Sequence, residues 1–251
     1  MKARRSSASN WLLALLGCFA VGHLSATLCA QPQSMSAAMP EHRFTHILLD
    51  QFEGRTNGDS NELRWDGEAW HGGDTNRLWV KSEAFVDGAT VSDGDHELLY
   101  DRPISRFRYF DAQAGLRMDI DSDPTRAWFA VGVEGLAPYH FEFAPTLYLR
   151  NGGRVAGRIV SMEDLLLTQR LIAQPEAELN FYSQDDAPRA VGSGLSDLDG
   201  GIRLRYEITR KVAPYVGFAW NGRFGDAADF VRQLGQPEHR SSFVFGLFVW
   251  R

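Results

Sequence analysis

Residues 202–209 read Ile-Arg-Leu-Arg-Tyr-Glu-Ile-Thr, with apolar side chains at the even positions and polar side chains at the odd positions. Successive side chains of a β-strand point to opposite faces of the sheet, so this pattern predicts a strand with one apolar and one charged face. The same alternation recurs near residues 76–86, 139–150 and 171–183. The chain is therefore expected to be all-β.

Asn-Gly and Asp-Gly pairs separate these alternating segments, as at Asn57-Gly58 and Asn151-Gly152. Such pairs supply the positive φ angles of tight hairpins, which join antiparallel strands. One short helix is expected near residues 227–234. About twelve strands are expected, near residues 44–55, 61–71, 76–86, 95–102, 106–120, 126–136, 139–150, 154–166, 171–183, 199–209, 213–221 and 242–250.

A soluble sandwich and a membrane barrel both fit an alternating chain, and three features favour the barrel. Several predicted strands reach ten residues, the length that crosses a bilayer at a tilt. Their number is even, as in bacterial outer-membrane barrels. The long connections, 184–198 and 222–241, both follow odd-numbered strands and would lie at one end. The sequence therefore predicts a transmembrane antiparallel β-barrel with short periplasmic turns and longer outer loops.

The first thirty residues have the layout of a secretory signal peptide. Lys2, Arg4 and Arg5 precede a short apolar segment, and small residues follow up to Ala30. The alternative is a membrane anchor, but the apolar segment is roughly half the ~20 residues needed to span. Residues 1–30 are thus expected to be a cleaved signal peptide, residues 31–43 a flexible periplasmic linker, and residues 44–251 the barrel.

Composition excludes several classes of protein. The mean hydropathy of −0.28 argues against several apolar membrane helices. The net charge of −6 argues against nucleic-acid binding. Both cysteines, Cys18 and Cys29, lie in the predicted signal peptide, so the exported chain would have no thiol.

The predicted inward face carries charges of both signs. The network of these charges can be interpreted as a salt-bridge plug in a narrow barrel, or as a polar path or binding site for a cation. The sequence leaves both interpretations open. The residues concerned are Arg77, Lys81, Glu83, Glu134, His140, Glu142, Arg150, Arg158, Asp164, Glu176, Glu178, Arg203, Arg205 and Glu207.

Histidine and methionine side chains add donors for a softer metal. Imidazole and thioether groups together suit copper better than magnesium or calcium. Met35, Met39 and His42 lie at short spacings in the linker, while His140 and Glu142 are two residues apart on one predicted inward face. Met118 and Met162 are further soft donors in the barrel. Enzyme motifs are absent from the sequence: there is no Gly-x-Ser-x-Gly and no His-Glu-x-x-His.

Several short motifs occur in order along the chain. They are residues 49–53 (LDQFE), 70–74 (WHGGD), 132–139 (GVEGLAPY), 167–172 (LTQRLI), 192–197 (GSGLSD), 203–208 (RLRYEI) and 213–217 (APYVG). With these motifs the chain resembles the copper resistance protein B family over about residues 47–250. That resemblance implies an outer-membrane barrel that contributes to copper resistance and homeostasis by binding or passing copper ions. Copper would be cargo here and not a catalytic cofactor.

Two departures from the family pattern are visible. The Met/His-rich segment that often precedes the barrel is reduced to Met35, Met39 and His42, and Arg251 follows the final aromatic residue. The candidate metal contacts are therefore divided between the two parts of the exported chain. They are Met35, Met39, His42 and His46 near the N-terminal linker, and Glu134, His140 and Glu142 in the lumen.

Expected partners are outer-membrane lipid, copper ions, and a periplasmic multicopper oxidase or copper-binding protein. Nucleic acid is not an expected partner. Two alternatives stay open. The first is a structural barrel that docks a periplasmic copper oxidase. The second is a barrel enzyme acting on lipid, although the chain is expected not to be an enzyme.

Overall fold

The structure is a computed structural model that describes residues 42–58, 61–87, 90–104, 109–120 and 125–251. Most of these residues lie in β-strands. Within them, no helix has the length and apolar character needed to cross a membrane. The predicted signal peptide and all but the last two residues of the predicted linker, including Met35 and Met39, lie outside the described residues.

Twelve long strands and one two-residue strand form a single sheet in the described part of the chain. The first six are β1 (Phe44–Thr56), β2 (Asn61–Gly72), β3 (Arg77–Asp87), β4 (Thr90–Pro103), β5 (Phe110–Asp119) and β6 (Arg126–Leu136). The others are β7 (Glu142–Arg150), β8 (Arg154–Met162), β9 (Leu165–Leu166), β10 (Leu171–Tyr182), β11 (Gly194–Tyr206), β12 (Val212–Arg223) and β13 (His239–Trp250).

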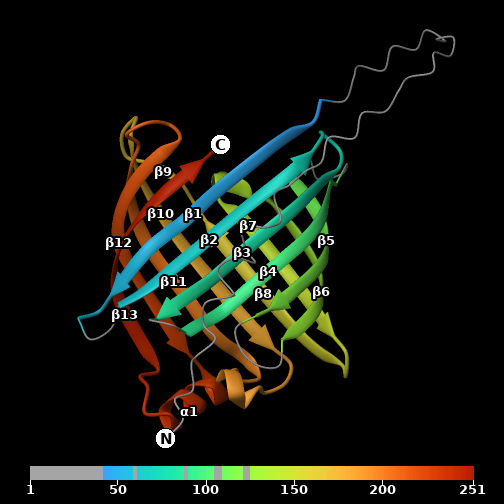
Figure 1. Cartoon of the computed structure of the whole chain (residues 1–251), viewed down its shortest axis with the longest axis vertical. Helices are drawn as coiled ribbons and strands as arrows, with labels where there is room; N and C mark the ends of the chain where they lie inside the picture. The colour runs from blue at the N-terminus through green and yellow to red at the C-terminus, as the bar shows by residue number, and fades with distance from the viewer. Residues whose placement is uncertain (1–41, 59–60, 88–89, 105–108, 121–124) are drawn as a thin grey trace, which may run out of the picture. The chain divides into compact units, whose positions relative to one another are not determined.

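The sheet closes on itself into an antiparallel barrel (Figure 1). Each long strand pairs with its neighbour in the chain, β8 pairs with β10, and β1 pairs with β13. The two-residue β9 pairs only with β10. Closure removes the exposed sheet edges that would otherwise leave backbone groups without partners in a bilayer. The prediction of a twelve-stranded antiparallel barrel is confirmed.

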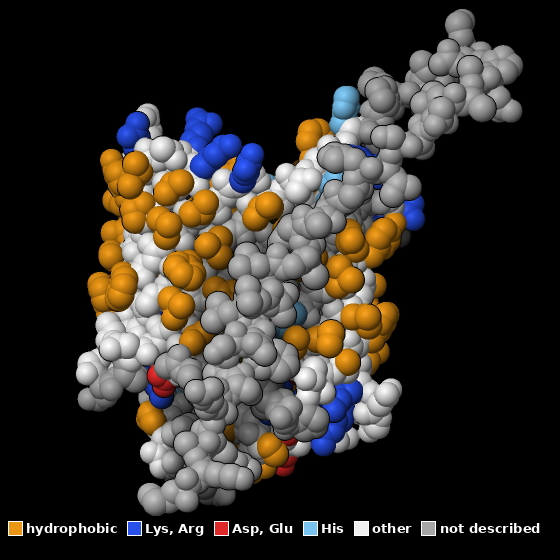
Figure 2. Space-filling view, in the orientation of Figure 1, with side chains coloured by type: hydrophobic (Ala, Val, Ile, Leu, Met, Phe, Trp, Pro, Cys, Tyr) orange, Lys and Arg blue, Asp and Glu red, His pale blue; other side chains and the backbone are white. Residues whose placement is uncertain are grey.

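The two faces of the wall differ as the alternation predicted. On β6, Trp128 and Ala130 are buried inside the barrel, whereas Phe129 and Val131 are almost half exposed on the outside. Figure 2 shows apolar side chains spread over the visible wall, with Lys and Arg side chains gathered near its two ends. An outward apolar band between polar ends is the arrangement of a barrel that crosses a membrane.

Several strand boundaries differ from the predicted ones, and three of these differences concern candidate site residues or their neighbours. The segment predicted as 139–150 becomes a strand only at Glu142, because Tyr139 and His140 both adopt φ angles of 71° and cannot belong to extended backbone. The strand predicted as 154–166 ends at Met162. The strand predicted as 199–209 runs instead from Gly194 to Tyr206, so Glu207, predicted to point inward, lies beyond its end.

The barrel has two distinct ends. The terminal end is where β1 begins, at Phe44, and β13 finishes, at Trp250. The far end carries the two longest connections: one contains the 3-10 helix η3 (Ala187–Arg189) and the other the helix α1 (Gly225–Gln233). These connections pack together, since a Cβ atom on Gly192 would lie 2.2 Å from the backbone nitrogen of Ala227. The expectation that the long connections share one end is confirmed.

Candidate functional site

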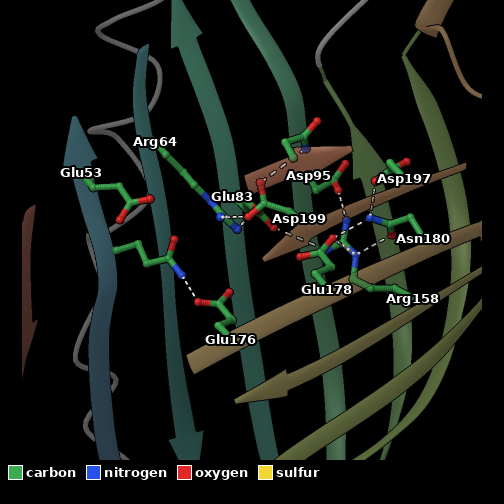
Figure 3. Close-up of polar contacts among 12 residues, drawn as sticks. Glu53, Arg64, Glu83, Asp95, Arg158, Glu176, Glu178, Asn180, Asp197 and Asp199 are labelled. Carbon is green, nitrogen blue, oxygen red and sulfur yellow. Dashed lines mark hydrogen bonds and ion pairs between the residues drawn. The ribbon is translucent and has the colours of Figure 1, made fainter. Parts of the chain in front are cut away.

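The far half of the lumen is crossed by ion pairs between strands that are distant in sequence (Figure 3). Arg64 on β2 pairs with Glu83 at 2.5 Å and with Asp199 on β11 at 3.1 Å. Arg55 on β1 donates to the same Asp199 at 2.8 Å. Nearby, Arg203 donates to Glu53 at 2.9 Å. These arginines are almost fully buried, so their charges are stabilised by partners and not by water.

A second group of ion pairs lies beside the first. Arg158 on β8 contacts Asp95 on β4 and lies 3.1 Å from Glu178 on β10. Arg117 on β5 pairs with Asp95 at 2.6 Å and with Asp119 at 2.7 Å. The two groups together span the lumen from wall to wall. They match the predicted salt-bridge plug in this half of the barrel.

The connection that carries η3 closes this network from the far end. Arg189 of η3 reaches Asp119 on the wall, with 3.2 Å between Nη1 and Oδ2. Asp186, one residue before η3, pairs with Arg126 on β6 at 2.9 Å. Arg126 is buried, and the side chain of Arg189 is only 5% exposed. The connection that carries η3 therefore blocks the far end of the lumen, and ion pairs hold it in place.

A cavity of about 170 Å³ lies on the other side of this network, and we call it the acidic chamber. Its wall holds ten carboxylates and only two basic side chains. Such an excess of one charge in a low-dielectric enclosure attracts cations. The carboxylates are Asp50, Asp66, Glu68, Glu83, Asp95, Glu97, Glu134, Glu142, Glu176 and Glu178; the basic side chains are Lys81 and Arg158.

The acidic chamber is more accessible to solvent than the ion pairs beside it. The side chains of Glu68 and Glu134 are 24% and 28% exposed, whereas Arg64 and Asp119 in the far half are each 1% exposed. Glu68 and Glu134 are thus hydrated carboxylates, while the charges of Arg64 and Asp119 depend on their ion-pair partners.

Lys81 places an ammonium group among the carboxylates of the acidic chamber. Its Nζ contacts Glu134 and lies 3.9 Å from Glu68. Glu134 also accepts a hydrogen bond of 3.1 Å from Gln113. The chamber therefore already holds one tethered cation, which shows that its geometry accommodates positive charge beside Glu134.

The structure brings together some of the predicted metal contacts and separates others. Glu134 and Glu142 line the same chamber. His140 does not: it lies exposed in the 3-10 turn η2 (Pro138–His140), so the prediction that it shares an inward strand face with Glu142 is corrected. His42 is exposed just before β1, and Met35 and Met39 lie outside the described residues.

His46 lies at the terminal end between two indole rings. Its ring centroid is 5.9 Å from that of Trp70 and 5.8 Å from that of Trp250, and both pairs are stacked. Its Nδ1 is buried without a hydrogen-bond partner among the described residues. This histidine is therefore held in place by packing and keeps one nitrogen lone pair or proton unsatisfied.

Met162 and Asp50 are chamber residues that the sequence analysis did not select. Met162 was named only as a soft donor, without a position in the lumen, and it ends β8 inside the chamber. Asp50 lies at a register shift between Leu49 and Gln51, so the strand changes phase there. A period-two count cannot follow such a bulge, because one inserted residue moves every later side chain to the other face.

On the outer wall, Ser82 and His96 are hydrogen-bonded at 3.0 Å. The indole N–H of Trp65 donates to the same Ser82 oxygen at 3.1 Å. Among the described residues, this Ser–His pair is the one feature that would favour the alternative of a lipid-acting enzyme. No carboxylate contact that would orient His96 accompanies it in the described part of the chain.

Within the described residues, no group of three or more His, Cys, Asp or Glu side chains is arranged to hold a metal ion. Carboxylates that line a chamber without converging on one point are suited to attract a mobile cation more than to fix a resident one.

Comparison with known proteins identifies similar sequences. Residues 43–250 match the family model described as copper resistance protein B precursor. The chain is 41% identical over 204 residues to copper resistance protein B of Escherichia coli, covering 81% of this chain and 68% of that protein. It is 36% identical over 206 residues to the copper resistance protein B homolog of Pseudomonas syringae pv. tomato, covering 82% and 69% respectively.

The fold also resembles a solved structure of the NanC porin. The TM-score is 0.51 with 13% sequence identity, and the match covers 82% of this chain and 99% of that one. At this identity the likeness bears on the fold alone. It agrees with the closed antiparallel barrel described above.

Proposed function

The chain belongs to the copper resistance protein B family, and from that premise we propose that its barrel receives copper ions in the acidic chamber from the periplasmic side. The family match and the barrel fold make the chain an outer-membrane barrel associated with copper resistance.

The observation that carries the proposal is the asymmetry of the lumen. Four of the ten chamber carboxylates are already paired with arginines, which leaves six against Lys81 and gives the acidic chamber a negative potential that concentrates cations. Arg158 in its wall, and Arg64 and Arg203 beyond it, hold positive charge inside ion pairs that a cation would have to disrupt. The geometry therefore favours capture from the terminal end over free diffusion through the barrel.

The linker that precedes β1 would deliver copper to the acidic chamber. Residues 1–30 are proposed to be removed on export, which leaves residues 31–43 as a linker joined to β1 at the terminal end. Met35, Met39 and His42 would capture copper there, close in sequence to His46 at the rim. Residues 44–251 would form the barrel. The terminal end would then face the periplasm, as expected for short turns.

Passage across the membrane needs a further step. A copper ion leaving the acidic chamber toward the far end would meet the Arg189–Asp119 contact and the buried arginine pairs. Passage would therefore require η3 and its connection to move, whereas storage or handover at the periplasmic side would not.

The alternative of a structural barrel is supported by one observation, the dense ion pairing of the far half. In that case the lumen would only stabilise the barrel, and its periplasmic rim would dock a multicopper oxidase or a copper-binding protein. A non-enzymatic role fits both proposals.

Copper binding by the purified full-length barrel separates the two proposals. We would compare the wild type with the Glu134→Gln/Glu142→Gln variant, each under reducing and oxidising conditions, and with a variant in which Met35, Met39 and His42 are replaced. Loss of binding in the carboxylate variant supports the acidic chamber. Binding that depends only on the linker variant, or is absent in the wild type, contradicts it.

A further inference from the structure

The acidic chamber contains one sulfur donor, at a defined place in its wall. Met162 is the last residue of β8, and its cross-strand partners are Glu142 on β7 and Glu176 on β10. All three side chains line the chamber. Directly opposed side chains on antiparallel strands have Cβ atoms about 4.5–5.5 Å apart. A thioether therefore lies between two carboxylates at one level of the lumen.

The thioether is held by a hydrogen bond that comes from the wall. Gln174 on β10 donates from Nε2 to the Met162 Sδ at 3.0 Å, and Gln174 is buried. Glu176 is fixed as well, because its Oε2 accepts from Gln51 and from Arg203, each at 2.6 Å. Methionine is otherwise a flexible side chain, so this anchoring limits where the sulfur can point.

The wall of the acidic chamber also contains one carboxylate oxygen without a hydrogen-bond donor among the described residues. Asp95, which is only 5% exposed and lines the same chamber, has its Oδ1 buried without a hydrogen-bond partner among the described residues. Its Oδ2 is already engaged by Arg117 and Arg158. A buried carboxylate oxygen without a donor is costly unless a cation or water satisfies it.

We infer that Met162, flanked by Glu142 and Glu176, is the specificity-determining contact of the acidic chamber and selects a soft monovalent copper ion over hard divalent cations. This inference rests on the proposed function of the chamber. Carboxylates attract any cation, and hard ions such as calcium and magnesium take only oxygen ligands. A thioether instead favours Cu(I).

Because the thioether is uncharged, the role of the sulfur can be tested without changing the charge of the acidic chamber. Replacing Met162 with Leu keeps the volume and the net charge of the chamber and removes only the sulfur. Electrostatic attraction should therefore persist, while the preference for a soft ion should disappear. Met118 offers a matched control, because it lies on the outer wall of β5, 45% exposed and away from the chamber.

The experiment uses the full-length chain in which Met35 and Met39 are replaced by Leu, so that the linker contributes no sulfur. We would measure Cu(I) affinity by competition with a chromogenic chelator under reducing conditions, and calcium binding by calorimetry. X-ray absorption would report whether sulfur is bound to copper. Heat-dependent gel mobility would establish that each variant is a folded barrel.

The expected result is that Met162→Leu weakens Cu(I) binding by about tenfold or more and removes the sulfur scatterer. Calcium binding should not change, and Met118→Leu should behave like its parent. Unchanged Cu(I) affinity in Met162→Leu overturns the inference alone, since the chamber would still bind copper. An equal loss of calcium binding also overturns it. A parent protein that binds no Cu(I) overturns both the inference and the proposed function.

Discussion

Arg189 and Asp119 are 70 residues apart in the chain, yet the Arg189 Nη1 lies 3.2 Å from the Asp119 Oδ2 inside the barrel. Arg189 comes from η3 in a far-end connection, whereas Asp119 ends β5 in the wall. Asp119 also accepts from Arg117 at 2.7 Å and from the indole of Trp128 at 2.8 Å. The loop is therefore attached to a carboxylate that the wall itself holds in place.

This contact predicts how the far end opens. Arg189→Ala should release the loop and increase the ion conductance of the barrel in planar lipid bilayers, because the arginine fills the lumen beside Asp119. Arg232→Ala is the matched control, since Arg232 lies exposed on α1 of the same end and its ion pairs within the described part of the chain are with Asp229 and Glu238. Equal conductance of the two variants would show that η3 is not the stopper.

The buried arginines predict a cost in stability. Arg64→Met should lower the free energy of unfolding by roughly 3 kcal/mol, because, among the described residues, Glu83 would keep only its 3.6 Å contact with Arg158 and Asp199 only its ion pair with Arg55. Urea titration of the barrel in detergent or lipid measures this change. Adding Glu83→Gln should recover part of the loss. A single variant as stable as wild type would contradict the importance of the network.

Lys81 predicts the charge preference of the acidic chamber. Lys81→Met should make the chamber more cation-selective, because it removes the ammonium that now contacts Glu134 and lies near Glu68. The reversal potential under a salt gradient measures the selectivity. Lys211→Met is the control, because Lys211 lies in a terminal-end turn over Trp250, outside the chamber. An equal shift of the reversal potential in Lys81→Met and Lys211→Met would show that the selectivity does not depend on the charge of the acidic chamber.

Substitutions of Glu142 and His140, which are two residues apart, should have different effects on copper binding. Glu142→Gln should weaken copper binding and copper tolerance, because Glu142 lines the acidic chamber. His140→Gln should leave both unchanged, because His140 lies exposed in the turn of η2. Growth on graded copper, with barrel abundance measured in outer-membrane fractions, tests the pair. If His140→Gln reduced copper tolerance and Glu142→Gln did not, the copper-binding residues would lie at the terminal rim and not in the acidic chamber.

The sequence alone predicted the architecture because a strand repeats every two residues. Alternation at residues 202–209 sorted Ile202 and Leu204 to the outside and Arg203 and Arg205 to the lumen, and the structure places them so. Strand length, strand number and the placement of the long connections followed from the same pattern together with Asn-Gly turns. The motifs between residues 49 and 217 were likewise enough to indicate the family.

The pattern could not predict local departures from its own period. The register shift at Asp50 and the positive φ angles at Tyr139 and His140 each interrupt the alternation. As a result, Asp50 was missed and His140 was assigned to a lumen that it does not reach. Such irregularities depend on backbone geometry at single residues, which period-two counting does not contain.

Only the tertiary structure decided which inward side chains meet. Arg203 contacts Glu53 because closure brings β11 near β1 across 150 residues, and no sequence spacing predicts that pairing. Barrel closure and strand stagger likewise divide the lumen into an ion-paired far half and an acidic chamber with Met162 in its wall. The sequence determined which face each side chain takes, since that is a local property. The partners of each charge depend on the three-dimensional register of all the strands together.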